Sequence, residues 1–82
     1  MPVARSPADI MGLAVYALAG GSTVRGFMVT TVAQRLGITS DRATELAEAA
    51  NRAGLVQHAP AGSVSLTAKG QERGTKLMAS MG

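Results

Sequence analysis

Side chains that could perform acid–base, nucleophilic or metal-binding chemistry are scarce in this sequence. It has no cysteine, and His58 is its single histidine. A cysteine-ligated zinc site and a histidine-rich metal site therefore lack their ligands, and a Ser-His-Asp triad has no second candidate base. We expect no catalytic residues, no metal and no cofactor, so the protein is not expected to be an enzyme. His58 is expected to be a partly exposed strand residue.

Hydrogen-bonding side chains follow one another closely between residues 30 and 45. Thr30 and Thr31 stand at the start of one predicted helix, and Ser40, Arg42 and Thr44 stand in the first turns of another. Arginine can form two hydrogen bonds with guanine, and hydroxyl groups can bond base edges or phosphates. Free N–H groups at a helix N-terminus also bind phosphate. These residue types indicate polar recognition, and the flanking elements must position them.

The first element that the sequence predicts is a helix over residues 7–19. Ser6 can cap it, Pro7 fits its first position, and Asp9 faces the positive end of the helix dipole. Gly20 ends it. Apolar residues at helical spacing predict one apolar face, formed by Ile10, Leu13, Ala14, Ala17 and Leu18.

The apolar run 10–19 within this helix also resembles the core of a secretory signal. It has ten residues, whereas about 20 are needed to span a bilayer. We therefore expect a buried helix, a cytoplasmic protein (nucleoid-associated if it binds DNA) and no membrane partner.

Two further helices are predicted over residues 28–36 and 40–53. Gly37 allows a left-handed exit from the first, and Thr39 or Ser40 caps the second. The apolar positions of the first are Val29, Val32, Ala33 and Leu36. The buried stripe of the second is almost entirely alanine and consists of Ala43, Leu46, Ala47, Ala50 and Ala53. Such small side chains predict unusually close packing.

After Gly54 the spacing of apolar residues changes from that of a helix to that of strands. Residues 55–58 and 63–66 predict a hairpin with one wet face, turned at Pro60 and Gly62. A brief extended stretch is also predicted over residues 23–27, before the second helix.

A last helix is predicted over residues 68–80, with Thr67 as its cap. Gly70 and Gly74 stand one turn apart in it, and each weakens the helix by about 1 kcal/mol relative to alanine. We expect these glycines to let another backbone approach closely.

Length and composition fit one small domain, residues 1–82. Hydrophobic residues make up 46% of the chain and charged residues 16%, which excludes a low-complexity disordered chain. Tyr16 and Phe27 are the two aromatic residues, too few to stack a single-stranded nucleic acid. The formal net charge of +3 is a mild excess, compatible with nucleic acid or an anionic surface.

The predicted elements form a mainly α fold of the α+β class, with a three-helix core, a β-hairpin wing and a C-terminal helix. Residues 32–39 (VAQRLGIT), 54–56 (GLV) and 66–70 (LTAKG) resemble bacterial winged helix-turn-helix regulators of the MarR and PadR kind. Gly37 and Gly54 stand seventeen residues apart, as this resemblance leads us to expect for the recognition helix. The resemblance covers about residues 28–77.

The resemblance implies a small DNA-binding transcriptional regulator whose helix 40–53 enters the major groove of double-stranded DNA. By resemblance, the exposed positions of this helix that face bases or phosphates are Ser40, Asp41, Arg42, Thr44 and Glu45. Thr30 and Thr31 are expected to hold a phosphate at the start of helix 28–36, and Arg35 and Lys69 are expected to contact flanking phosphates. Two copies would bind a palindromic site as a homodimer. The first and last helices have more apolar residues than a three-helix core needs, so the expected dimer interface is Ile10, Leu13, Leu77, Met78 and Met81.

Two features depart from a DNA-binding pattern and support an alternative. From Asp41 to Arg52 there are three acidic and two basic residues, a net charge of −1, whereas DNA affinity depends largely on cations near phosphates. The wing, residues 58–63, has no lysine or arginine. The alternative is a winged-helix protein–protein interaction module of a bacterial or phage adaptor, in which Arg42 and Glu45 form only a solvated ion pair.

Overall fold

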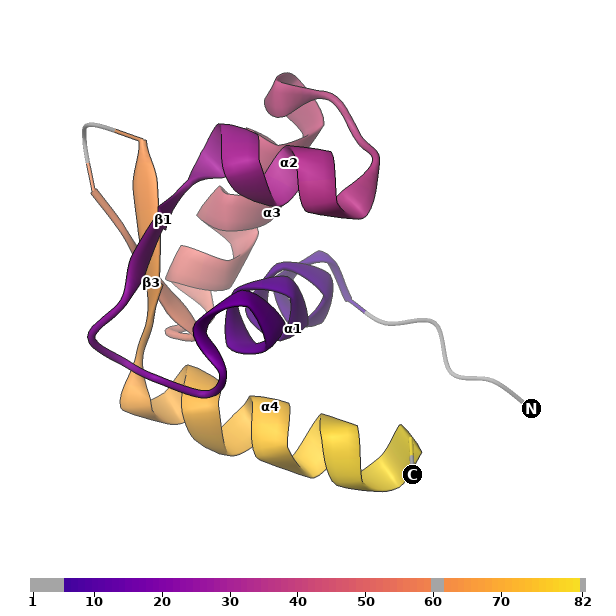
Figure 1. Cartoon of the computed structure of the whole chain (residues 1–82), viewed down its shortest axis with the longest axis vertical. Coiled ribbons are helices and arrows are strands. Elements are labelled where there is room, and N and C mark those ends of the chain that lie inside the picture. The colour runs from indigo at the N-terminus through magenta and orange to yellow at the C-terminus, as the bar shows by residue number, and fades with distance from the viewer. Residues whose placement is uncertain (1–5, 60–61, 82) are drawn as a thin grey trace.

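The computed structural model of the chain describes residues 6–59 and 62–81 (Figure 1). Along the chain the elements are α1 (Pro7–Ala19), β1 (Gly26–Met28), α2 (Val29–Leu36), α3 (Ser40–Arg52), β2 (Val56–His58), β3 (Ser63–Leu66) and α4 (Ala68–Met81). The predicted fold class, mainly helical with a small β-sheet, is confirmed. Figure 1 shows α2 at one end of the molecule and α4 at the other, with α1 between them.

A third strand joins the predicted hairpin. The sheet has the order β1-β3-β2, and both pairings are antiparallel. The extended stretch before the second helix supplies β1, in which Phe27 lies opposite Val64. Met28 keeps an extended backbone (φ −70°, ψ 143°), so α2 begins at Val29, one residue later than predicted. In β3, Val64 and Leu66 are buried, as the predicted alternation requires.

Local hydrogen bonds fix the ends of the helices where the sequence indicated. The Ser6 Oγ accepts from the N–H of Asp9 (3.2 Å) at the start of α1. The Thr39 Oγ1 accepts from the N–H of Arg42 (3.2 Å) at the start of α3. Gly37 ends α2 with φ +70°, a left-handed conformation that glycine adopts without steric cost.

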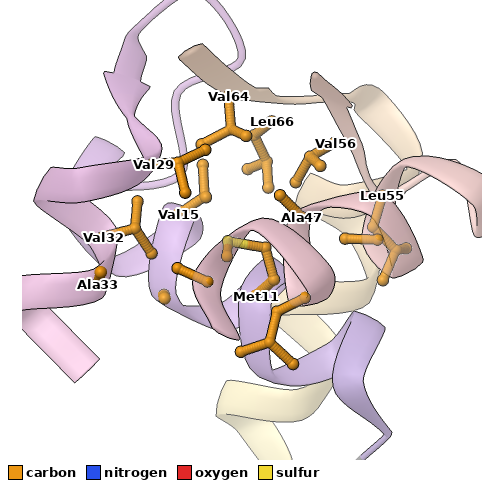
Figure 2. Close-up of a cluster of buried hydrophobic side chains, with 14 residues drawn as sticks. Met11, Val15, Val29, Val32, Ala33, Ala47, Leu55, Val56, Val64 and Leu66 are labelled. Carbon is orange, nitrogen blue, oxygen red and sulfur yellow. The ribbon is translucent and has the colours of Figure 1, made fainter. Parts of the chain in front are cut away.

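The core lies where α1, α2 and α3 meet one face of the sheet (Figure 2). Its largest fully buried side chains are Met11, Val15, Val32, Val56, Val64 and Leu66. Most of the predicted alanine stripe is also buried: Ala43, Ala47 and Ala50 are 0% exposed and Leu46 is buried, whereas Ala53, which follows α3, is half-buried. Within the described residues no polar or charged side chain is buried, so the core is held together by apolar packing alone.

The core-facing side of α1 matches the face that its spacing predicted only in part. Of the predicted residues, Ala14 is buried and Leu18 is half-buried. Met11 and Val15 are 0% exposed and lie in the core (Figure 2). Ile10 and Leu13 are half-buried, and Ala17 is exposed. The helix is apolar almost all round, with one charged residue among its 13, so spacing alone cannot decide which side faces inward. No helix in the described ranges combines the length and hydropathy that crossing a membrane requires.

The two glycines of α4 mark the places where it docks. A Cβ at Gly70 would overlap the backbone carbonyl of Leu55, which confirms the predicted close approach of another backbone. Gly74 instead makes room for the ring of Tyr16, since a Cβ there would lie 2.8 Å from the ring Cγ. The Tyr16 hydroxyl also lies 3.2 Å from the Thr75 Oγ1. Glycine thus allows close packing at both places, once against backbone and once against a side chain.

Candidate nucleic-acid interface

α2 and α3 form a helix-turn-helix with a short turn at residues 37–39. The N–H of Ile38 donates to the carbonyl of Ala33 (3.0 Å), and the N–H of Gly37 donates to that of Gln34 (3.3 Å). These bonds satisfy carbonyl groups that the end of α2 would otherwise leave unpaired. Together with the Thr39 cap, they hold the start of α3 in a fixed position against α2.

The face of α3 opposite its alanine stripe is open to solvent along the first two turns. Ser40, Asp41, Arg42 and Glu45 are exposed. Thr44 is partly buried, and its hydroxyl donates to the carbonyl of Ser40 (2.9 Å). Five of the nine expected DNA contacts are therefore brought together on one surface, which we name the α3 outer face.

This outer face continues to the end of the helix. Glu48, Asn51 and Arg52 are all exposed. An asparagine amide can form two hydrogen bonds with adenine, so Asn51 adds a group that can recognise bases. Asn51 follows Thr44 by seven residues, and helical periodicity was the signal that could have identified it.

Arg42 forms an ion pair within α3. Its Nη1 lies 3.0 Å from the Glu45 Oε2, and the two side chains are 56% and 67% exposed. An exposed pair of this kind contributes about 0.2–1 kcal/mol. The guanidinium can therefore exchange Glu45 for a base or a phosphate at small cost.

The start of α2 offers a second polar group of atoms. Thr30 and Thr31 are exposed there, and no side chain caps the helix. The N–H of Val29 donates to the carbonyl of Gly62 (2.8 Å), which holds the end of the hairpin turn beside α2. The N–H groups of the next residues lie at the positive end of the helix dipole. With two hydroxyl groups beside them, they can bind a phosphate.

Lys69 lies apart from the other expected contacts. A Cβ at Gly54 would lie 3.5 Å from the Lys69 Cδ, so this side chain runs beside the second residue after the end of α3. A helix of 13 residues is about 20 Å long, which separates Lys69 from Ser40 and Arg42. Arg35, in the last turn of α2, is exposed and borders a groove over α1.

The other cations of α4 are paired with acids of the chain. Arg73 donates two hydrogen bonds to the carboxylate of Asp9, at 3.0 and 3.1 Å. These bonds and the charge of Asp9 raise the pKa of Arg73 above its ordinary value. The Lys76 Nζ lies 3.6 Å from the Glu72 Oε1. A groove of about 520 Å³ contains both pairs together with Lys69, so its lining is of mixed charge.

The residues expected at a dimer interface are divided between two places. Ile10, Leu13 and Met78 border an apolar groove of about 310 Å³. Leu77 is half-buried and lines a narrow space between α1 and α4, so its side chain packs within this chain. The side chain of Met81 lies outside the described residues.

His58 is a partly exposed residue of β2, as predicted. Within residues 6–59 and 62–81, no three His, Asp or Glu side chains lie close enough together to hold a metal ion.

Comparison with protein-family models and with curated proteins found no match. The function is therefore inferred from the geometry of α3 and its surroundings.

Proposed function

We propose that this protein is a small DNA-binding transcriptional regulator of the winged helix-turn-helix type. The observation that carries the proposal is the open α3 outer face, which presents hydrogen-bonding side chains while the opposite alanine face is buried. The major groove of DNA admits an α-helix in this way. The short turn between α2 and α3 supports the proposal because it braces the helix that would enter the groove.

In the proposed complex the start of α3 lies in the major groove. Arg42 leaves Glu45 and bonds a guanine edge, and Ser40 and Asn51 bond neighbouring bases. Glu45, once released, can accept a hydrogen bond from the amino group of cytosine. Thr30 and Thr31 at the start of α2 hold a backbone phosphate and so fix the orientation of the domain.

A titration with labelled duplexes of random sequence tests the proposal. We expect binding at micromolar protein in about 50 mM salt, with affinity that falls as salt rises. Selection from the same random library should enrich one sequence, because base contacts discriminate between sequences. If no duplex binds at micromolar protein under these conditions, the proposal fails.

A matched pair of variants separates base recognition from simple charge attraction. Arg42→Ala and Lys76→Ala each remove one positive charge and one exposed ion pair within a helix. Arg42→Ala should weaken binding to the selected duplex by about tenfold or more, since a bidentate base contact contributes about 1–3 kcal/mol. Lys76→Ala should change it by less than about twofold. Equal losses would mean that the protein responds only to net charge.

A second candidate function is a winged-helix module that binds another protein. The observation that favours it is the acidic balance of the α3 outer face, where Asp41, Glu45 and Glu48 stand against Arg42 and Arg52. Such a face would complement a basic partner. A partner identified by co-purification should then keep its affinity for the Arg42→Ala variant, while the random duplexes remain unbound.

We also propose that the regulator acts in the cytoplasm, associated with the nucleoid, and that two copies occupy a palindromic site. Each copy would place one α3 in successive major grooves, about 34 Å apart. Sedimentation of the protein–duplex complex should give two chains per duplex. One chain per duplex would exclude the pair of copies and leave DNA binding itself in place.

A further inference from the structure

Figure 1 shows α1 between α2 and α4. The outer side of α1 is the floor of an apolar groove whose lining includes residues of both neighbouring helices. The groove has a volume of about 310 Å³ and is lined by Ile10, Leu13, Ala14, Ala17, Arg35, Leu36 and Met78. Met78 is 44% exposed, and methionine adapts its shape readily to a partner. We name this surface the α1 groove.

α1 has the composition of a helix that is covered on both sides. Its inner side, with Met11 and Val15, is fully buried in the core. Its outer side is also apolar, although Ala17 is exposed and Ile10 and Leu13 are only half-buried. A helix that is hydrophobic all round is normally buried on every side. Covering the α1 groove with an apolar occupant is therefore expected to be more favourable than leaving it exposed to water.

The charge at the groove indicates what kind of occupant it takes. Arg35 is the one charged residue of the lining; it is exposed, and it makes no ion pair with any described part of the chain. A second copy seated by two-fold symmetry would bring the same lining against itself, and that lining contains Arg35 and no acidic residue. An occupant with a carboxylate at this position complements Arg35, whereas a like charge opposes association.

We propose that the α1 groove binds a short apolar helix of another protein, with a carboxylate beside its apolar stripe. Residues 10 to 17 of α1 cover about two helical turns, roughly 10 Å, so the occupant would use apolar residues at i, i+3, i+4 and i+7. Its carboxylate pairs with Arg35. This proposal does not depend on DNA binding, because the α3 outer face takes no part in it.

Two synthetic helical peptides of 14 residues provide the probe. Both carry the same leucine and alanine stripe, and they differ only in a glutamate or a lysine at the flanking position. In a titration with the full chain we expect the glutamate peptide to bind in the micromolar range and the lysine peptide about tenfold more weakly. Arg35→Glu should reverse this preference. Lys69→Glu makes the same change of charge outside the groove and should leave the preference unchanged.

A variant of the groove floor supplies the steric test. Ala17→Gln places a longer side chain at an exposed position and should lower the affinity for the glutamate peptide by about tenfold. Ala17→Ser should bind this peptide with the affinity of the parent chain. Thermal unfolding checks that both variants are folded. The same Ala17→Gln variant should keep its affinity for duplex DNA, so that a failure of this proposal can be told from a failure of DNA binding.

Three results would overturn the proposal. The first is an absence of binding of either peptide at about 100 µM, which corresponds to a Kd weaker than a specific contact provides. The second is equal binding of the two peptides or an unchanged preference in Arg35→Glu. The third is a concentration-dependent dimer of the chain that Ala17→Gln abolishes, because that would assign the groove to a second copy.

Discussion

α1 and α3 pack against each other at the centre of the molecule, and they differ in what they leave outside. Both bury an apolar inner side, which is Met11 and Val15 on α1 and the alanine stripe on α3. The outer side of α1 is apolar and borders a groove, while that of α3 is polar and open. Packing within the chain thus accounts for one side of each helix. The partners proposed for the other sides differ accordingly: an apolar helix for α1 and DNA for α3.

The largest expected effect concerns the two sides of α1. Met11→Ala removes a side chain that is 0% exposed, and we expect it to lower the free energy of unfolding by about 2–5 kcal/mol. Ile10→Ala, one residue earlier on the half-buried outer side, should cost about 1 kcal/mol or less. Urea denaturation measures both. Equal losses would show that the outer side is packed as tightly as the inner one and would remove the contrast.

The caps at the starts of α1, α3 and α4 could be predicted because they depend on local chemistry. Ser6 and Thr39 each accept a hydrogen bond from the N–H three residues later, as their positions before apolar runs indicated. Thr67 does the same for Gly70 (2.9 Å), and its hydroxyl also donates to the carbonyl of Gly54. The second bond joins residues far apart in the sequence, and no local pattern predicts it.

The remaining differences arise where neighbours in space decide the outcome. The inward side of α1 was predicted only in part: Ala14 is buried as expected, but apolar residues surround the helix, and contact with α3 and the sheet also selects Met11 and Val15. Lys69 was expected to contact a flanking phosphate, and the position of its side chain beside Gly54 is set by the packing of α4, which no local pattern predicts. On α3 the exposed positions followed from the alanine stripe, because there the apolar residues occupy one side only.

An intermediate effect is expected on the inner side of α3. Ala47 is 0% exposed in the stripe that packs toward α1, so Ala47→Leu adds volume where there is no space and should cost about 1–3 kcal/mol. Glu48→Leu introduces the same side chain at the next, exposed position and should change stability by no more than about 0.5 kcal/mol. Chemical denaturation of the pair measures this. An Ala47→Leu variant as stable as the parent would contradict close packing of α3.

The smallest expected change in stability concerns the cap of α3. The same variants also compare binding at the α3 outer face with binding at the α1 groove. Thr39→Ala removes the acceptor for the N–H of Arg42 and should lower the free energy of unfolding by about 1 kcal/mol, while Thr39→Ser keeps the cap. A frayed first turn displaces Ser40 and Arg42, so duplex affinity should fall in Thr39→Ala and be retained in Thr39→Ser.

Binding of the glutamate peptide should stay within about twofold in both cap variants, because Thr39 does not line the α1 groove. Titrations of the two ligands at a temperature where every variant is folded make the comparison. If the two affinities fall together, the α3 outer face and the α1 groove are coupled through α2, which contributes Arg35 to the groove and braces the start of α3. The two surfaces would then act as one unit, and the difference in their chemistry would no longer imply separate partners.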